Sequence, residues 1–272
     1  MMNIIEQEKS DLLKSITDRY GYDFLDYSEA SIKRRIIRFA ELNKFNNYFD
    51  LKHHLLNNES LFAQFVLEVT VNVTEMFRDP SFFISLVENV FPILQTFPHR
   101  KIWHAGCSTG EEVYSLAIFL HEQNLFENTR QYATDVNTTV IKKAKDGIYS
   151  LERIREYTRN YQKAGGMADF SDYYTAHYDS AIMNYELKKY MVFSNHNLVS
   201  DKSFNEFNLI VCRNVLIYFN WQLQEKVIQL FDESLSLFGY LALGSKESIM
   251  LNSIKHKYEV IDERNKIYRK IA

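Results

Sequence analysis

Hydrophobic positions recur at two different spacings in this chain, and the change falls near residue 97. Up to residue 67, apolar residues return every three or four positions, which is the period of an amphipathic helix. This pattern predicts a small helical domain over residues 1–70 with no strand, and Ser28 or Ser31 is the expected N-cap of one of its helices. The periodic positions are Ile5, Leu12, Leu13 and Ile16, then Ile32, Ile36, Ile37 and Phe39, and then Leu51, Leu55, Leu56 and Phe65.

Beyond residue 97, short apolar runs alternate with amphipathic segments of helix length, as in a parallel sheet with crossover helices. Residues 168–190 are rich in aromatics at a rough period of two, which predicts a small antiparallel insertion. The long third helix is expected to end at Gly239 as its C′ residue. The predicted strands are 101–105, 130–135, 191–195, 207–212, 240–245 and a closing antiparallel pair over YEVID and KIYRKI, and the helices are 111–123, 137–145 and 221–238. The predicted fold class is therefore α/β.

Composition sets limits on this picture. The chain has 272 residues, 46% of them hydrophobic, with only 8 Gly and 3 Pro, so we expect a full core and no long disordered linker. The sequence has no apolar stretch of membrane-spanning length and no signal-peptide pattern at its start, which predicts a cytoplasmic protein without direct membrane insertion. Cys107 and Cys212 are expected to be reduced thiols in that compartment, although a pair is the alternative.

Charge is balanced overall and concentrated in one place. A net charge of −3 supplies no general positive field, so nucleic acid is not an expected partner. The histidines are scattered without a Cys/His cluster, so no metal site is expected. In the segment SIKRRIIRF, Lys33, Arg34, Arg35 and Arg38 fall within six residues. Such a run is usually the solvated face of a helix, and the alternative is a docking surface for an acidic partner.

The turn AGCSTG follows the first predicted strand, where open α/β sheets bind their ligands. Its glycine spacing matches the dinucleotide fingerprint poorly, and Glu111 stands where a phosphate-binding loop would have Lys. Carboxylates repel a di- or triphosphate, whereas a cationic nucleoside such as S-adenosylmethionine suits them. Glu111 would accept from its ammonium group, with Glu112 as the alternative, and Asp135 would accept from both ribose hydroxyls. Asp135 as a helix cap is the competing interpretation.

Four motifs in order resemble the chemotaxis receptor methyltransferases of the CheR type. They are NVTEMFRD (72–79), AGCSTGEEVYSLA (105–117), ATDVNTTVIKKAKDGIYS (133–150) and CRNVLIYF (212–219), with SNHNLV (194–199) between the last two. The resemblance covers nearly the whole chain. It implies a class I, Rossmann-like S-adenosylmethionine-dependent methyltransferase domain over residues 98–272, a linker over 71–97 that contributes to the cofactor site, and S-adenosylhomocysteine as the product.

The resemblance also implies roles for individual residues. Tyr218 would contact the substrate side chain, with a core aromatic as the alternative, and Arg78 or Arg213 would supply positive charge beside it. Glu111 would bind the methionine amino group and Asp135 the ribose. The other implied cofactor residues are Asn72, Thr74 and Arg78 in the linker, Asn197 and Leu198 beside the adenine, and Arg213 and Asn214 beside the methionine moiety.

The implied activity is methylation of glutamate side chains on chemoreceptors, by a monomer. Its partner would be the acidic helical bundle of the receptor, met by Lys33, Arg34, Arg35 and Arg38. In some family members the antiparallel insertion also docks a receptor C-terminal peptide, and the sequence does not decide that point. The alternatives are a methyltransferase acting on nucleic acid or a small molecule, and a non-catalytic module that binds the cofactor.

Overall fold

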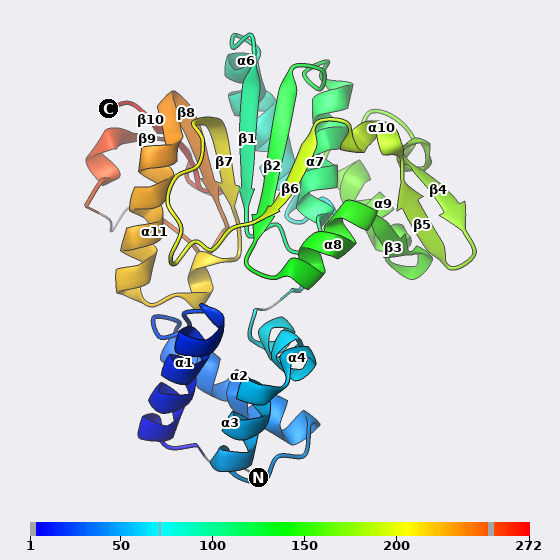
Figure 1. Cartoon of the computed structure of the whole chain (residues 1–272). Coiled ribbons are helices and arrows are strands. Elements are labelled where there is room, and N and C mark those ends of the chain that lie inside the picture. Colours follow the sequence, from blue (N-terminus) through cyan, green and yellow to red (C-terminus); the bar gives the residue numbers. More distant parts are fainter. Residues whose placement is uncertain (1–3, 71, 250–252) are drawn as a thin grey trace. The chain divides into compact units, whose positions relative to one another are not determined.

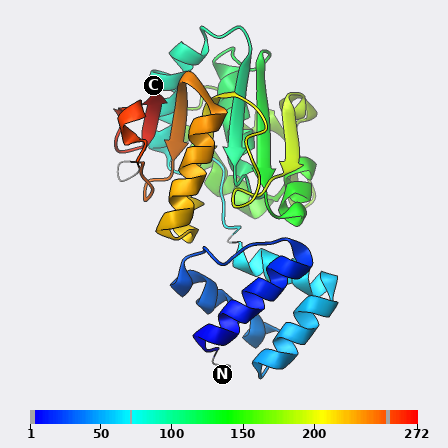
Figure 2. The same ribbon diagram turned by 60° about the vertical axis from the view of Figure 1, so that its left-hand side comes forward.

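The structure, a computed structural model, describes residues 4–70, 72–249 and 253–272 (Figure 1). The chain divides into two compact units. The first comprises Met1–Asn72 and Leu216–Val227, and the second comprises Val73–Val215 and Ile228–Ala272. Figures 1 and 2 show the first as a group of helices and the second as a sheet flanked by helices.

The first unit confirms the predicted helical domain. Its helices are α1 (Glu6–Tyr20), α2 (Glu29–Leu42), α3 (Tyr48–Asn57) and α4 (Glu59–Val69). Most of the periodic apolar residues are buried in one core, whereas Ile5 is 56% exposed and Ile4 is buried in its place. Ser28 occupies the N-cap of α2, although its side chain makes no capping hydrogen bond.

The segment after the fourth long strand belongs to this helical unit. It contains the short helix η3 (Leu216–Tyr218) and the start of α11 (Trp221–Ser234). The Ser28 amide donates to the Tyr218 carbonyl at 2.8 Å, and the Asn220 amide donates to the Asp26 carbonyl at 2.8 Å. The rings of Tyr27 and Phe219 pack edge to face with centroids 5.1 Å apart. Tyr218 is thereby fixed to the N-terminal helices by backbone contacts on both sides.

The second unit is a seven-stranded, mostly parallel sheet in the order β6-β2-β1-β7-β8-β10-β9. The closing antiparallel pair and the other predicted strands are confirmed to within a residue, except that the strand predicted over 240–245 spans Leu235–Leu243. Strand β1 lies between β2 and β7, so the strand order reverses at its carboxyl end. The predicted turn at that end is followed by α7 (Glu111–Glu122), and β2 is followed by α8 (Thr138–Asp146). The strands are β1 (Arg100–Ala105), β2 (Thr129–Asp135), β6 (Met191–Asn195), β7 (Phe207–Cys212), β8 (Leu235–Leu243), β9 (Tyr258–Asp262) and β10 (Ile267–Lys270).

Aromatic side chains from the linker and from several helices pack together in the main core of this unit. Phe77, Phe83, Phe119, Tyr161 and Phe170 contact one another within it. Cys107 and Cys212 are buried and unpaired, as expected. No helix among the described residues is both long enough and apolar enough to cross a membrane. The short helices are α5 (Pro80–Ser85), η1 (Leu86–Val90), α6 (Phe91–Leu94), η2 (Phe170–Tyr173), α10 (Tyr185–Lys188) and η4 (Lys255–Lys257).

The antiparallel insertion is real, but its predicted range is incomplete. The small sheet has the order β3-β5-β4, and β3 (Ile148–Ser150) lies outside 168–190, where β4 (Tyr174–His177) and β5 (Ser180–Met183) are found. Three residues are too few to show a period. The intervening α9 (Leu151–Lys163) was not predicted, although its buried residues Ile154, Tyr157 and Tyr161 recur at the spacing of an amphipathic helix.

The predicted end of the long helix is wrong. Helix α11 ends at Ser234, and Gly239 lies inside β8 instead of capping the helix. Leu235 pairs with Phe207 and Tyr240 with Leu209, with a shift in register between the two pairs. Pairing with β7 therefore outweighs the helical spacing of apolar residues, which had predicted a helix as far as residue 238. Gly239 is needed at this irregularity, since a Cβ there would lie 2.9 Å from the Ser236 carbonyl oxygen.

Candidate functional site: the turn after β1 and its cavity

The turn between β1 and α7 depends on glycines in the left-handed region. Gly106 has φ +78° and Gly110 has φ +92°. A Cβ at Gly106 would lie 2.5 Å from Cγ2 of Val215. The amides of Gly106 and Cys107 both donate to the Thr134 carbonyl, at 2.8 and 2.9 Å, so the turn is fastened to the end of β2.

Asp135 lies at that end of β2 and faces the turn. Its Oδ2 accepts from the Ser108 amide and its Oδ1 from the Asn137 amide, both at 2.9 Å. Burial raises the pKa of Asp135 despite these backbone hydrogen bonds. The N-cap of α8 is Asn137, whose side chain accepts from the Thr139 amide, so Asp135 does not serve as that cap. The carboxylate is held against the ligand-binding turn.

Glu111 is 1% exposed and is the first residue of α7. Thr109 Oγ1 donates to its Oε2 at 2.6 Å, and Tyr157 donates to its Oε1 at 3.5 Å. Among the described residues its one ion-pair partner is Arg153, whose Nη1 lies 3.6 Å from Oε1 and whose side chain is 52% exposed. Burial raises the pKa of Glu111 above its ordinary value, because these partners compensate the buried charge only in part.

Glu112 points into a different network. Its Oε1 lies 3.1 Å from His104 Nδ1, and its Oε2 lies 3.4 Å from Arg213 Nη1. Burial alone would raise the pKa of Glu112, but the hydrogen bond with His104 and the charge of Arg213 hold it below its ordinary value. This carboxylate already has its countercharge within the protein.

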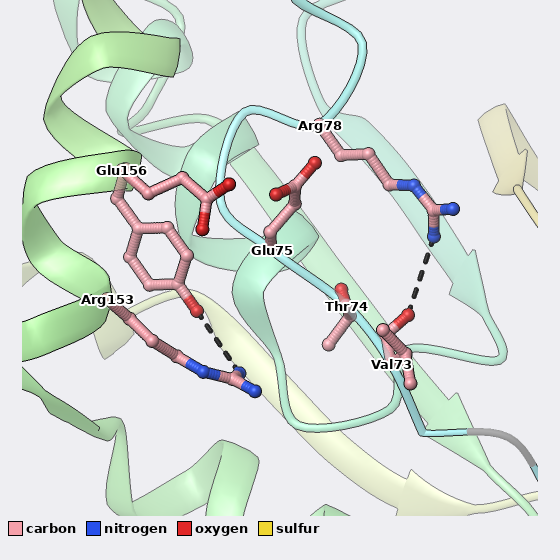
Figure 3. A pocket seen from close by; sticks show the side chains of 7 residues that line it. Val73, Thr74, Glu75, Arg78, Arg153 and Glu156 are labelled. Carbon is pink, nitrogen blue, oxygen red and sulfur yellow. Dashed lines mark hydrogen bonds between the residues drawn. The ribbon is translucent and has the colours of Figure 1, made fainter.

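A cavity of about 250 Å³ is shown in Figure 3, and its lining includes Arg153 and Tyr157, the two α9 side chains that contact Glu111. In Figure 3 the linker presents Thr74, Glu75 and Arg78 on one side, and α9 presents Arg153 and Glu156 on the other. Burial, together with the neighbouring Glu156, raises the pKa of Glu75. The lining is completed by Val73 and Tyr157, and Tyr157 contacts Glu111. The structure thus brings the predicted linker residues Thr74 and Arg78 to the α9 side chains that contact Glu111.

The other predicted cofactor residues of this unit lie in the loops after β6 and β7. Asn197 accepts from the Val199 amide at 3.0 Å, and the neighbouring Leu198 is buried. Asn214 has φ +60° and donates its amide to Glu247 at 3.1 Å. Neither loop contributes to the cavity beside Glu111.

The remaining predicted residues lie in the helical unit. Arg35 stacks over the ring of Tyr218, with 5.7 Å from Cζ to the ring centroid, and donates to the Glu68 carbonyl at 2.9 Å. Arg38 pairs with the Glu68 carboxylate at 3.0 Å while remaining 68% exposed. Lys33 is half-buried and Arg34 is exposed. Asn72 donates its side-chain amide to the Leu67 carbonyl at 3.2 Å.

Sequence reasoning missed several side chains around the two glutamates. Thr109, Arg153 and Tyr157 surround Glu111, and His104 contacts Glu112. Thr109 is close to Glu111 in the sequence, and its hydrogen bond could have been anticipated. The helical spacing of Ile154, Tyr157 and Tyr161 could have predicted α9, but nothing in the sequence places Arg153 and Tyr157 beside Glu111.

The turn has buried acceptor groups that suit the ammonium group and the ribose hydroxyls of S-adenosylmethionine. Glu111 is a buried carboxylate without full compensation, which an ammonium group would supply, and Asp135 is a second carboxylate within the same turn. The hydroxyl of Ser108, between them, is buried and has no hydrogen-bond partner among the described residues. A bound polar ligand would satisfy it.

Comparison with known proteins shows the family of this chain. Residues 72–267 match the family model "CheR methyltransferase, SAM binding domain", and residues 7–70 match "CheR methyltransferase, all-alpha domain". A Pseudomonas putida protein described as "Putative methyltransferase Cher3" is 46% identical over 95% of each chain. The "Chemotaxis protein methyltransferase" of Listeria innocua is 32% identical over 85% of this chain and 86% of its own, and that of Salmonella typhimurium is 29% identical over 86% and 81%. The chain belongs to the CheR methyltransferase family, and residues 72–267 are its S-adenosylmethionine-binding domain.

Proposed function

We propose that this protein methylates glutamate side-chain carboxylates of chemoreceptors, forming glutamate methyl esters in chemotactic adaptation. The observation that carries the proposal is the match of both CheR domains, in order, over residues 7–70 and 72–267. Relatives that align with most of this chain bear the name chemotaxis protein methyltransferase. The glutamate acceptor is inferred from that likeness.

In this proposal the turn and the linker hold S-adenosylmethionine. Glu111 binds the ammonium group, Asp135 accepts from the ribose hydroxyls, and Thr74 and Arg78 cover the ligand from the cavity wall. Asn72 extends the linker side, Asn197 and Leu198 flank the adenine, and the loop with Asn214 borders the methionine moiety. The sulfonium of the bound cofactor supplies an electrophilic methyl group.

The residues of this chain then have to orient a carboxylate and exclude water. A glutamate with an ordinary pKa of about 4.3 is ionised at neutral pH, so no general base is required. Tyr218 donates a hydrogen bond to the acceptor carboxylate, and Arg78 supplies positive charge. Alignment of this kind can contribute several kcal/mol to the lowering of the barrier.

Helix α2 provides the surface for the receptor. An acidic helical bundle is attracted to a basic helix, which raises the association rate at low ionic strength. Arg34 and Arg38 are the more exposed of the four basic side chains, whereas Arg35 is turned toward Tyr218 and Glu68. We assign docking mainly to Arg34, Arg38 and Lys33.

The test is incubation of the full chain with methyl-labelled S-adenosylmethionine and receptor-rich membranes. We expect base-labile methyl esters on the receptor, and none on a receptor whose acceptor glutamates are changed to alanine. The Asp135→Ala enzyme is the matched negative control, because it should fail to bind the cofactor. Label in nucleic acid or a small molecule, or cofactor binding without any methyl ester, would replace the proposal by another methyltransferase or by a binding module.

A further inference from the structure

Arg213 follows β7, and its side chain is only 3% exposed. Its Nη2 lies 2.6 Å from Asp79 Oδ2, and its Nη1 lies 3.4 Å from Glu112 Oε2. Nη1 also donates to the Arg78 carbonyl at 3.3 Å, and the guanidinium carbon lies 4.0 Å from the centroid of the Phe82 ring. These contacts direct the guanidinium toward the linker, and Arg213 does not line the cavity beside Glu111.

The linker that Arg213 contacts has an unfavourable backbone conformation. Phe77 has φ +54° and Asp79 has φ +55°, although neither is glycine. Each such residue is strained and persists only where its surroundings hold it. The Phe77 amide donates to Ser115 Oγ at 2.9 Å, and Arg213 holds both the Arg78 carbonyl and the Asp79 carboxylate. Without these contacts the linker would relax to other conformations.

The network continues from Arg213 into the centre of the sheet. Glu112 contacts His104 Nδ1 at 3.1 Å, and His104 Nε2 contacts Gln131 Oε1 at 3.0 Å. His104 and Gln131 are completely buried and lie on the adjacent strands β1 and β2. Five side chains therefore connect the central strands to the linker. Buried networks rigidify a structure to the extent that their members are satisfied, and here only Gln131 Nε2 and Arg213 Nε have no hydrogen-bond partner among the described residues.

We propose that Arg213 is a positioning residue that holds the linker Val73–Asp79 through Asp79 and Glu112, so that Thr74 and Arg78 form the wall of the cofactor cavity. The guanidinium of Arg213 then raises cofactor affinity through the linker and not by its own contact with the cofactor. The alternative is direct contact through its Nε atom, which is buried and has no partner among the described residues. Only the positioning role depends on Asp79, because Asp79 does not line the cavity and could affect binding only through the linker.

The test measures binding of S-adenosylhomocysteine to the full chain by calorimetry, with no acceptor present. Asp79→Asn should weaken binding roughly ten-fold, since coupling between contacting residues of a network reaches a few kcal/mol. Arg213→Lys should weaken binding to a similar extent. The double variant should bind about as tightly as either single variant, because both substitutions remove the same link. Asp79→Glu keeps the charge and should restore most of the affinity.

Hydrogen exchange of the ligand-free protein gives a second measurement. Amides in residues 73–79 should exchange faster in Asp79→Asn, while those of β1 and β2 keep their protection. A linker that exchanges at the same rate in both proteins would overturn the proposal.

Asp232→Asn is the matched control. Asp232 is a buried acid of the same unit, paired with Lys257 at 2.7 Å and Lys270 at 3.4 Å, and it is absent from the cavity lining. It should lower the melting temperature without changing cofactor affinity. Equal weakening by Asp79→Asn and Asp232→Asn would show general loosening, and weakening by Arg213→Lys alone would show direct contact. Either result rejects the positioning role, and neither depends on the identity of the methyl acceptor.

Discussion

Glu111 and Glu112 are consecutive in the sequence, yet their carboxylates lie in separate environments. Glu111 is buried against Thr109 and Tyr157 beside the cavity, with a raised pKa. Glu112 is paired with His104 and Arg213, with a lowered pKa. The sequence left open which of them binds the cofactor ammonium. Because Glu112 already has its countercharge, the structure favours Glu111.

Substitution of the two glutamates should therefore have different effects on binding. Glu111→Gln removes the charge that receives the ammonium group, so we expect at least a ten-fold loss of S-adenosylhomocysteine affinity in calorimetry, in line with the loss of a charge-assisted hydrogen bond. Glu112→Gln should chiefly lower thermal stability, with a smaller effect on affinity. The assignment would be reversed if Glu112→Gln caused the larger loss of affinity.

Cofactor affinity should fall on acidification because of Glu111. Binding of the ammonium requires the ionised carboxylate, and the pKa of Glu111 in the ligand-free protein is raised above the ordinary 4.5. As the pH falls toward that raised pKa, the ionised fraction declines, so the loss should begin at a higher pH than for an exposed glutamate. Calorimetry across the acidic range checks this, with Glu111→Gln expected to have a flatter profile. Equal slopes in the two proteins would contradict it.

Ionisation of Glu111 and of Glu112 should contribute to the free energy of unfolding with opposite signs. The raised pKa of Glu111 means that its charged form costs stability at neutral pH, and this cost is relieved as the pH falls through the raised value. The lowered pKa of Glu112 means that its contribution is present above the ordinary value and is lost as the pH falls through the lowered one. Denaturant unfolding of both glutamine variants against pH measures the two contributions, and identical pH dependences would refute the opposite signs.

Gly106→Ala should destabilise the turn more than Gly165→Ala destabilises its own site. Both glycines have positive φ, but only the Cβ at position 106 meets a side chain, at 2.5 Å from Val215, while nothing lies within 4 Å of position 165. We expect a loss of roughly 2–4 kcal/mol in the free energy of unfolding at Gly106 from strain and overpacking together, and about 1 kcal/mol at Gly165. Adding Val215→Ala should recover part of the difference. Equal losses at both glycines would argue against the clash.

Tyr218→Phe should lower kcat for methyl transfer at least ten-fold while cofactor affinity is unchanged. The variant removes the donor that orients the acceptor carboxylate but keeps the ring over which Arg35 stacks. Initial rates with receptor-rich membranes, together with calorimetry, separate the two quantities. Full activity in Tyr218→Phe would reduce this residue to a packing role.

Charge reversal of Arg34 and Arg38 should raise the apparent KM for the receptor, and the increase should shrink at high salt because screening weakens long-range attraction. Both side chains are exposed, but Arg38 also pairs with Glu68 at 3.0 Å, so its reversal should cost some stability while that of Arg34 should not. Rates at low and high ionic strength provide the measurement, with cofactor affinity as the internal control. An unchanged KM would exclude α2 as the docking surface.

The spacing of apolar residues was sufficient to predict the fold class, the helical N-terminal domain and most strands of the large sheet, because these depend on local sequence. The order of the motifs was sufficient to predict the family, because each motif consists of residues close together in the chain. Three features were decided by tertiary contacts. Pairing of Leu235 with Phe207 ended α11 early, a three-residue strand joined the small sheet, and the polar helix α9 reached the cavity through Tyr157. The distinction between Glu111 and Glu112 was likewise invisible in the sequence. It arises because His104 and Arg213 contact Glu112, and Asp79 in turn pairs with Arg213. These residues come together only when the sheet is assembled.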